Sequence, residues 1–189
     1  LFSATLDGDI SQVVKEFQNN PKRHESNSQE AEPDIEHRFW IVGRNDRVET
    51  ISQLVNQYER IILFCRTKHG CDRLAKQLDN SGVRSSIIHG NKSQAQRERS
   101  LEEFRRGSSN VLVATDVAAR GIHIDDAPCV VHFDPPADHK DYIHRSGRTG
   151  RAGSKGVVIS LVDNSQKRTV NKLARDAGVD ADFIAPDFE

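Results

Sequence analysis

The sequence predicts an α/β fold in which a doubly wound parallel sheet has helices on both faces. Short apolar runs, such as residues 60–65 and 111–114, alternate along the chain with segments of helical periodicity. The runs are apolar at consecutive positions, which is typical of strands that are buried on both faces. Strands separated by helices pair in parallel through crossover connections. At 189 residues the chain is long enough for one such domain.

The expected elements follow one another in a regular order. Six segments have the composition of strands, and they are residues 34–42, 60–65, 84–89, 111–114, 129–133 and 156–162. Helices are expected between and after them, at residues 48–58, 71–78, 93–104, 138–145 and 163–177. Asn45 is a possible cap of the first helix, and Ser93 with Gln96 forms a capping box before the third. Gly107 and Gly178 are expected to end two of the helices.

Composition limits the classes of function. The chain has 27 basic and 28 acidic residues, so its net charge is -1, and any attraction to nucleic acid must come from a local cluster. No apolar run is long enough to span a membrane, and no signal peptide opens the chain. The three cysteines are odd in number and contain no C-x-x-C pair. We therefore expect neither a disulfide framework nor a metal site, and we expect a reducing, cytoplasmic setting.

The most informative stretch is the arginine segment, residues 144–151, with the sequence HRSGRTGR. Arg145, Arg148 and Arg151 would repel one another, and we expect them to gain little by facing a core. A guanidinium keeps its charge and its fork matches phosphate oxygens, while glycine lets the backbone approach an anion closely. A solvated basic turn and a phosphate clamp are both compatible with this pattern. The chain has no P-loop, so a clamp would act on a phosphate that is held elsewhere.

Other chemically informative residues follow the predicted strands. Residues 66–68 follow the second strand, 89–90 the third and 115–121 the fourth. The carboxyl ends of parallel strands lie at one edge of the sheet, and ligands collect in the crevice outside that edge. The sequence therefore predicts one site built along this edge.

Five motifs, taken together and in order, resemble those of the DEAD-box RNA helicases. They are Ser3-Ala4-Thr5, LFCRT at residues 63–67, QAQR at 94–97, ATDVAARG at 114–121 and HRSGRTGR at 144–151. The resemblance covers nearly the whole chain. It implies that residues 34–189 form the second, C-terminal RecA-like domain of a helicase core. Residues 1–19 would then be the tail of the first RecA-like domain, 20–33 a linker, and the chain a fragment of a longer protein.

Carried over position by position, the resemblance assigns three sets of residues. The ATP-side residues, with Arg148 and Arg151 as catalytic arginine fingers, are Gly121, His123, Arg148 and Arg151. The residues that couple the two domains are Ser3, Ala4, Thr5, His144 and Arg145. The residues along the RNA backbone are Arg66, Thr67, Gly90, Gln94, Arg97, Thr115, Asp116 and Arg120. His123 departs from the family pattern, which has an aspartate there for the ATP ribose.

The resemblance also implies an activity for the full-length protein. It would be an RNA-stimulated ATPase whose partners are RNA, ATP and the first RecA-like domain. That first domain would hold most of the ATP and its Mg²⁺, so the fragment alone is expected to be inactive. The alternative is a RecA-like module that binds RNA or protein without turnover.

Overall fold

The computed structural model describes residues 34–119, 127–151 and 154–188 of the chain. All of the described residues belong to one compact unit, Ala31–Glu189. The segments predicted as domain tail and linker, 1–19 and 20–33, therefore lie outside the described residues.

The described residues form a parallel sheet of seven strands, which confirms the predicted fold class. The strands are β1 Ile35–Ile41, β2 Ile61–Phe64, β3 Ser85–Ile88, β4 Val111–Ala114, β5 Cys129–His132, β6 Gly156–Val162 and β7 Phe183–Ile184. Their order across the sheet is β3-β4-β2-β5-β6-β1-β7, and every neighbouring pair is parallel. The two-residue strand β7, at the edge beside β1, is the one that the sequence pattern did not predict.

Six α-helices connect these strands or follow them within the described residues. They are α2 Arg47–Gln57, α3 Lys68–Asn80, α4 Gln94–Arg105, α5 Asp116–Ala119, α6 His139–Ser146 and α7 Lys167–Asp176. A 3₁₀ turn, η1 Asn164–Gln166, precedes α7. The short helix α5 occupies part of the segment that the sequence suggested was a loop.

The helix ends test the predicted caps. At α4 the capping box is confirmed, because the Gln96 backbone N–H donates to Ser93 Oγ and the Ser93 N–H donates to Gln96 Oε1. The expected cap at Asn45 is wrong. Asp46 occupies the N-cap position of α2, and its side chain makes no capping hydrogen bond. Asp163 begins η1 rather than α7 directly.

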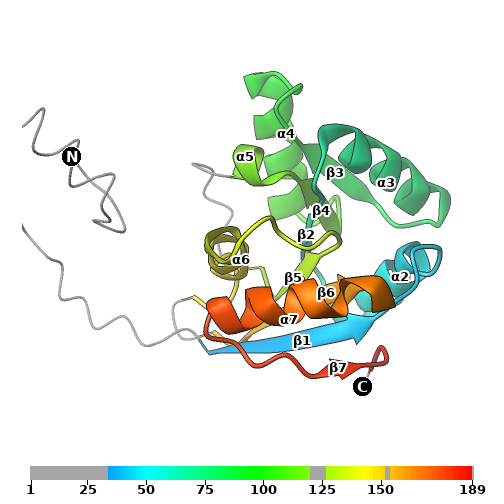
Figure 1. Ribbon diagram of the computed structural model, residues 1–189. Coiled ribbons are helices and arrows are strands. Elements are labelled where there is room, and N and C mark those ends of the chain that lie inside the picture. The colour runs from blue at the N-terminus through cyan, green and yellow to red at the C-terminus, as the bar shows by residue number, and fades with distance from the viewer. Residues whose placement is uncertain (1–33, 120–126, 152–153, 189) are drawn as a thin grey trace, which may run out of the picture. The chain divides into compact units, whose positions relative to one another are not determined.

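Helices cover both faces of the sheet because the strands bury alternate side chains on opposite sides. Ile61 and Leu63 of β2 pack in one cluster with residues of α2 and α3, and Ile62 and Phe64 pack in another with residues of α4 and α5. The helices α6 and α7 pack on Phe39 and on other residues of β1 and β6. Figure 1 shows the strands crossing the domain, with α2 and α3 on one side and α5 and α6 on the other.

The distribution of helices sets where crevices form at the carboxyl edge of the sheet. The chain leaves β1 and β2 toward the face of α2 and α3, whereas it leaves β3, β4, β5 and β6 toward the other face. Neighbouring strands whose connections diverge in this way are β2 with β4, β2 with β5 and β6 with β1. Such divergences are the points at which doubly wound sheets bind ligands.

Candidate functional site

The loops after β2, β3 and β4 meet along the carboxyl edge of the sheet, as the sequence predicted, and the loop after β5 joins them. Lys68 Nζ donates to Asn91 Oδ1 at 3.0 Å, which joins the loop after β2 to the loop after β3. The Arg66 backbone N–H donates to Asp134 Oδ2 at 3.0 Å, which joins the same loop to the end of β5. These bonds hold one continuous row of loops together.

Two of the predicted RNA-side residues stand at the start of α3. Thr67 is the N-cap, and its Oγ1 accepts a hydrogen bond of 3.0 Å from the Gly70 backbone N–H. The Arg66 side chain is exposed beside it. A hydroxyl, a guanidinium and the first turn of a helix are groups that suit an anion such as phosphate.

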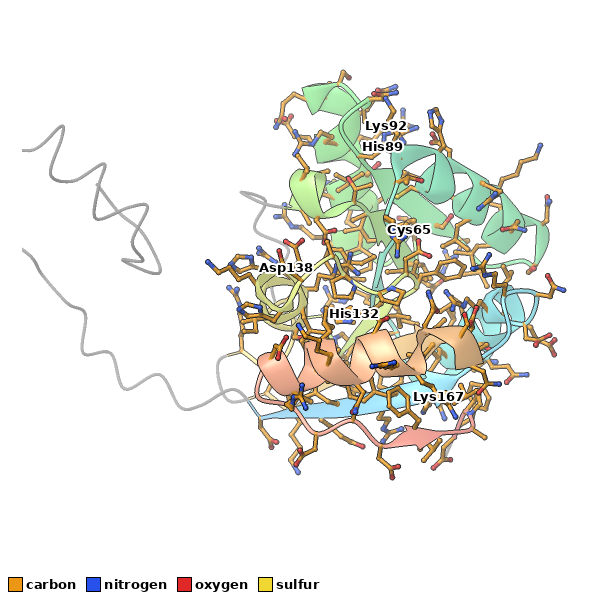
Figure 2. The ribbon with its side chains drawn as sticks, in the orientation of Figure 1. Cys65, His89, Lys92, His132, Asp138 and Lys167 are labelled. Carbon is orange, nitrogen blue, oxygen red and sulfur yellow. The ribbon has the colours of Figure 1, made fainter. Side chains whose placement is uncertain are left out.

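Gly90 is positioned by a buried histidine. His89 is 1% exposed, its Nε2 lies 2.9 Å from Asp72 Oδ1, and its Nδ1 accepts from the Asn91 backbone N–H. Lys92 also contacts this carboxylate, at 3.3 Å, and Figure 2 shows His89 and Lys92 together near α4. The hydrogen bond from His89, together with Lys92, lowers the pKa of Asp72. This network fixes the turn that presents Gly90 to solvent.

The first turn of α4 carries Gln94 and Arg97. Arg97 Nη2 donates to the Ala118 carbonyl at 3.0 Å, and its Nη1 lies 3.4 Å from Gln94 Oε1. Arg97 thereby joins α4 to α5, next to Thr115. Arg120 lies outside the described residues, so its position beside this group stays a prediction.

Arg145 corrects the expectation that the arginines gain little by facing the core. Its side chain is 2% exposed and donates twice to Asp116, from Nε to Oδ1 at 2.6 Å and from Nη2 to Oδ2 at 2.8 Å. Its Nη1 donates to the Asp134 carbonyl at 2.8 Å, and the guanidinium lies 5.2 Å from the centre of the Phe64 ring. The bidentate ion pair explains the burial, because it satisfies a charge that could not otherwise leave water.

Asp116 accordingly has a structural task that sequence reasoning missed. Both oxygens of its carboxylate accept hydrogen bonds from Arg145, so the carboxylate joins α5 to α6. The contact between Asp116 and RNA stays a prediction. Sequence reasoning missed this ion pair for two reasons. The four residues of α5 are too few to produce a periodic pattern, and Asp116 and Arg145 are 29 positions apart in the sequence.

The other two arginines of the segment project differently. Arg148 is half-buried beside His144 and Arg145 and lines a small cleft with Asp116 and Asp141, while Arg151 is exposed. Arg151 Nε donates to the Gly147 carbonyl at 2.7 Å, which closes the turn after α6. The segment therefore contains one buried, one half-buried and one exposed arginine.

Gly150 makes this turn possible. Its φ of 68° lies in the left-handed region, and a Cβ atom there would stand 2.6 Å from Ile35 Cγ1 and 3.3 Å from the Asp34 carbonyl. Both constraints require glycine. Thr149, directly before it, is fully buried. Ser146 is also buried and donates to the Tyr142 carbonyl at 2.8 Å, so it packs locally within α6.

A buried polar network packs against Tyr142 of α6. His132, at the end of β5, is 0% exposed and its Nδ1 lies 3.1 Å from Ser160 Oγ, while its ring packs against Tyr142. Figure 2 shows His132 in the interior of the domain. Burial, reinforced by the positive charge of Arg145, lowers the pKa of His132 well below its ordinary value. The Tyr142 hydroxyl is bonded in turn to His37 Nδ1 at 2.8 Å.

Further observations concern the core, membrane spans and metal ligands. Cys65, Cys71 and Cys129 are free and buried, and Trp40 is fully buried, as residues that pack in the core. None of the helices in the described ranges is long and apolar enough to cross a bilayer. Within those ranges, no three His, Cys, Asp or Glu side chains gather into a set that could hold a metal ion.

Several predicted site residues lie outside the described residues. They are Ser3, Ala4, Thr5, Arg120, Gly121 and His123.

Comparison with known proteins gives consistent matches over the same region. Residues 46–153 match the family described as the helicase conserved C-terminal domain. The chain is 39% identical over 164 residues to the ATP-dependent RNA helicase RhlB of Shewanella sp. (strain MR-4), covering 85% of this chain and 37% of that protein. It is 37% identical over 186 residues to DEAD-box ATP-dependent RNA helicase 30 of Arabidopsis thaliana, covering 94% of this chain and 32% of that protein.

Solved structures give the same result. Saccharomyces cerevisiae Dbp5 bound to RNA and ADP BeF3 superimposes with a TM-score of 0.78 and 30% identity, over 100% of this chain and 51% of that one. Escherichia coli DEAD-box protein SrmB bound to regulator of ribonuclease activity A superimposes with a TM-score of 0.72 and 33% identity, over 81% and 90%. The doubly wound sheet is therefore RecA-like. The chain spans about a third of the length of the curated relatives named above. This chain belongs to the DEAD-box RNA helicase family, and it contains the conserved C-terminal RecA-like domain of that family.

Proposed function

We propose that the protein containing this chain is an ATP-dependent RNA helicase in which this domain acts on ATP held by a first RecA-like domain. Arg148 and Arg151 would reach the γ-phosphate of that ATP, and Gly121 and His123 would lie on the same nucleotide side. The curated relatives are named as ATP-dependent RNA helicases, and the Dbp5 structure is described as bound to RNA and ADP BeF3. Mg²⁺ would be held mainly by the first domain.

The division of the arginine segment is the observation that supports this proposal most. Arg145 is anchored inside the domain by Asp116, whereas Arg148 is half-buried and Arg151 is exposed on the following turn. A turn closed through Gly147 and Gly150 limits how far these two side chains can move. Arginines that stay partly or fully accessible to solvent on a constrained turn suit a phosphate supplied by another domain.

The chemistry of such a contact follows from the guanidinium group. It stays protonated, so it can stabilise charge that develops on phosphate oxygens during transfer without any proton movement. An arginine finger of this kind typically contributes about 10³–10⁵ in rate. The domain supplies a part of the active site that the first domain would lack, which makes hydrolysis depend on closure of the two domains.

The RNA would run along the carboxyl edge of the sheet. Arg66, Thr67, Gly90 and the first turn of α4 offer hydroxyl, guanidinium and backbone N–H groups in one row. These groups are suited to phosphate and sugar and do not distinguish bases. RNA binding by this domain would therefore be largely independent of sequence.

Arg145 would couple the RNA side to the nucleotide side. It is joined through Asp116 to α5, which Arg97 contacts, and through its own helix to Arg148 and His144. Val117 and Ile143, which are 76% and 50% exposed, stand next to this ion pair in α5 and α6. Exposed apolar side chains of this kind suit a contact with the first domain and its Ser3-Ala4-Thr5 segment. The free, buried cysteines suit a cytoplasmic protein.

The test is Arg148→Ala in the full-length protein, assayed for RNA-stimulated ATP hydrolysis and for RNA affinity. We expect kcat to fall by about 10³ or more, with RNA affinity changed by no more than about twofold because Arg148 is not on the RNA edge. Arg84→Ala is the matched control. Arg84 precedes β3 at the amino edge of the sheet, opposite to the carboxyl edge of the proposed RNA row, and it contacts Asn110 at 3.3 Å. Equal loss of hydrolysis and RNA binding would contradict the finger role, and RNA binding without any hydrolysis in the unaltered protein would favour a binding module.

A further inference from the structure

A second cavity opens at the carboxyl edge of the sheet, on the side of α2 and α3. Its volume is about 570 Å³, and its walls come from α2, α3, η1 and the residues that follow β1, β2 and β5. This position lies at two of the divergences described above, between β2 and β5 and between β6 and β1. The fold therefore places the cavity where doubly wound sheets bind ligands.

The lining of this cavity is strongly cationic. Four arginines contribute to it, namely Arg44, Arg47, Arg66 and Arg73, against one carboxylate, that of Asp134. The side chain of Arg44 is 79% exposed and has a contact of 3.5 Å with Asp163 Oδ2. Among the described residues, the Arg66 and Arg73 guanidinium groups have neither a hydrogen-bond partner nor an ion-pair partner. Four positive charges in one concave wall focus the field on an anion.

Arg47 is the unusual member of this set because it is 4% exposed. Its Nη1 donates to the Phe133 carbonyl and its Nη2 to Gln166 Oε1 at 3.2 Å, and both of these acceptors are neutral. The nearest described carboxylate oxygen is Asp134 Oδ1, 3.9 Å from Nη1. Arg47 Nε is buried without a hydrogen-bond partner among the described residues. A buried cation with so weak a counter-ion is costly, and an anion in the cavity would compensate it.

Asp134 does not neutralise the cavity. Its carboxylate is 34% exposed, and Oδ2 accepts the hydrogen bond from the Arg66 backbone N–H. One carboxylate that is shared in this way leaves an excess of positive charge on the lining. The first turn of α3, with Thr67 and Gly70, also lines the cavity and adds the positive end of a 13-residue helix.

We propose that this cavity binds a phosphate group through Arg44, Arg47 and Arg73, to which the helicase function proposed above gives no task. The phosphate comes either from an RNA strand that continues past Arg66 and Thr67 or from a small polyphosphate. RNA is the favoured source, because Arg66 and Thr67 line the cavity and also belong to the predicted RNA row. The proposal does not require ATP hydrolysis or a first domain.

The experiment titrates the ¹⁵N-labelled 189-residue chain with sodium tripolyphosphate and, separately, with a single-stranded ten-nucleotide uridine RNA. The amide resonance of Gly70 reports on the cavity, and that of Gly147 reports on the arginine segment. The variant is Arg73→Gln, which removes an exposed cavity charge without disturbing the core. The control is Arg84→Gln, at the amino edge of the sheet.

We expect Gly70 to shift on titration and the dissociation constant read from it to rise roughly tenfold in Arg73→Gln but not in Arg84→Gln. Loss of affinity for both ligands identifies RNA as a source, and loss for tripolyphosphate alone identifies a small polyphosphate. A Gly70 resonance that moves with neither ligand, or equal affinities in the two variants, overturns the proposal. These outcomes are separate from the ATPase assay, which tests the finger role.

Discussion

Removal of the Asp116 carboxylate is expected to destabilise the domain strongly. In Asp116→Ala, the guanidinium of Arg145 loses both of its charged hydrogen bonds and keeps only the Asp134 carbonyl and the Phe64 ring. Because Arg145 is 2% exposed, its charge then has no close counter-ion and little water. Breaking a buried pair in this way costs about 3–5 kcal/mol. Asp116 itself is 23% exposed, so water can enter the space that its carboxylate leaves. We therefore expect the free energy of unfolding to fall by about 3 kcal/mol.

Replacement of Arg145, the other partner of the ion pair, should lower the free energy of unfolding by less than Asp116→Ala does. In Arg145→Met, an apolar chain of similar length stays on the Phe64 ring, and the partly exposed Asp116 carboxylate can be hydrated. The Asp134 carbonyl loses one donor, which costs about 1–2 kcal/mol. The double variant should then be about as stable as Arg145→Met alone. The difference in the free energy of unfolding between Asp116→Ala and Arg145→Met measures the cost of burying the unpaired Arg145 cation, rather than the strength of the ion pair.

Urea unfolding of the chain, followed by far-UV circular dichroism, gives the free energy of unfolding for each variant, with unchanged m-values as the check on two-state behaviour. Glu102→Ala is the control, because it removes an exposed partner of Arg106 on α4 and should change stability by less than about 0.5 kcal/mol. The reasoning is refuted if Asp116→Ala loses less than about 1 kcal/mol. It is equally refuted if Arg145→Met is the more damaging single change.

Two further predictions concern the turn and the buried histidine. Gly150→Ala should lower the midpoint of thermal unfolding by several degrees more than Gly178→Ala does. Both glycines have a positive φ, but only at Gly150 would an added Cβ also clash with Ile35. Equal shifts in the two variants would show that this contact relaxes. His132 has a folded pKa well below its unfolded value of about 6.5, so the unfolded chain binds the extra proton, and stability that is complete above pH 6.5 should fall as pH decreases. Urea titrations at pH 7.5, 6.5 and 5.5 should show that His132→Gln flattens this slope, and an unchanged slope would assign it to other groups.

The fold was largely predictable because its signals are local. Strands β2, β4 and β5 are buried at every position, so apolar runs mark them directly in the sequence. The box of Ser93 and Gln96 and the positive φ of Gly107 and Gly178 likewise depend only on near neighbours. Helix α5, with four residues, and β7, with two, are too short for any periodic pattern. Tertiary contacts determine both of them.

The site was predictable only in part, because its charged residues are paired through the fold. The sequence placed the loops at one edge, since parallel strands impose it, but not which arginine would turn inward. Arg145 is buried because Asp116 and Asp134 come to it from two other strand ends. The cluster of His89 and Asp72 is non-local in the same way. A motif shows which charged groups are present. It does not show which of them is buried, because burial depends on partners that are distant in the sequence.

The buried ion pair strengthens the case for the arginine fingers rather than weakening it. Arg148 follows Arg145 by three residues, so anchoring Arg145 to α5 and to the end of β5 fixes the base of the turn that carries Arg148. Asp134, which follows β5, also accepts the hydrogen bond from the Arg66 backbone N–H, so the proposed RNA row and the finger turn share one attachment. If the proposed closure occurs, these attachments would let this part of the domain move as a unit. Under the proposed function, RNA bound to the row would then help to place Arg148 and Arg151, because the ion pair of Arg145 with Asp116 links the two groups of residues.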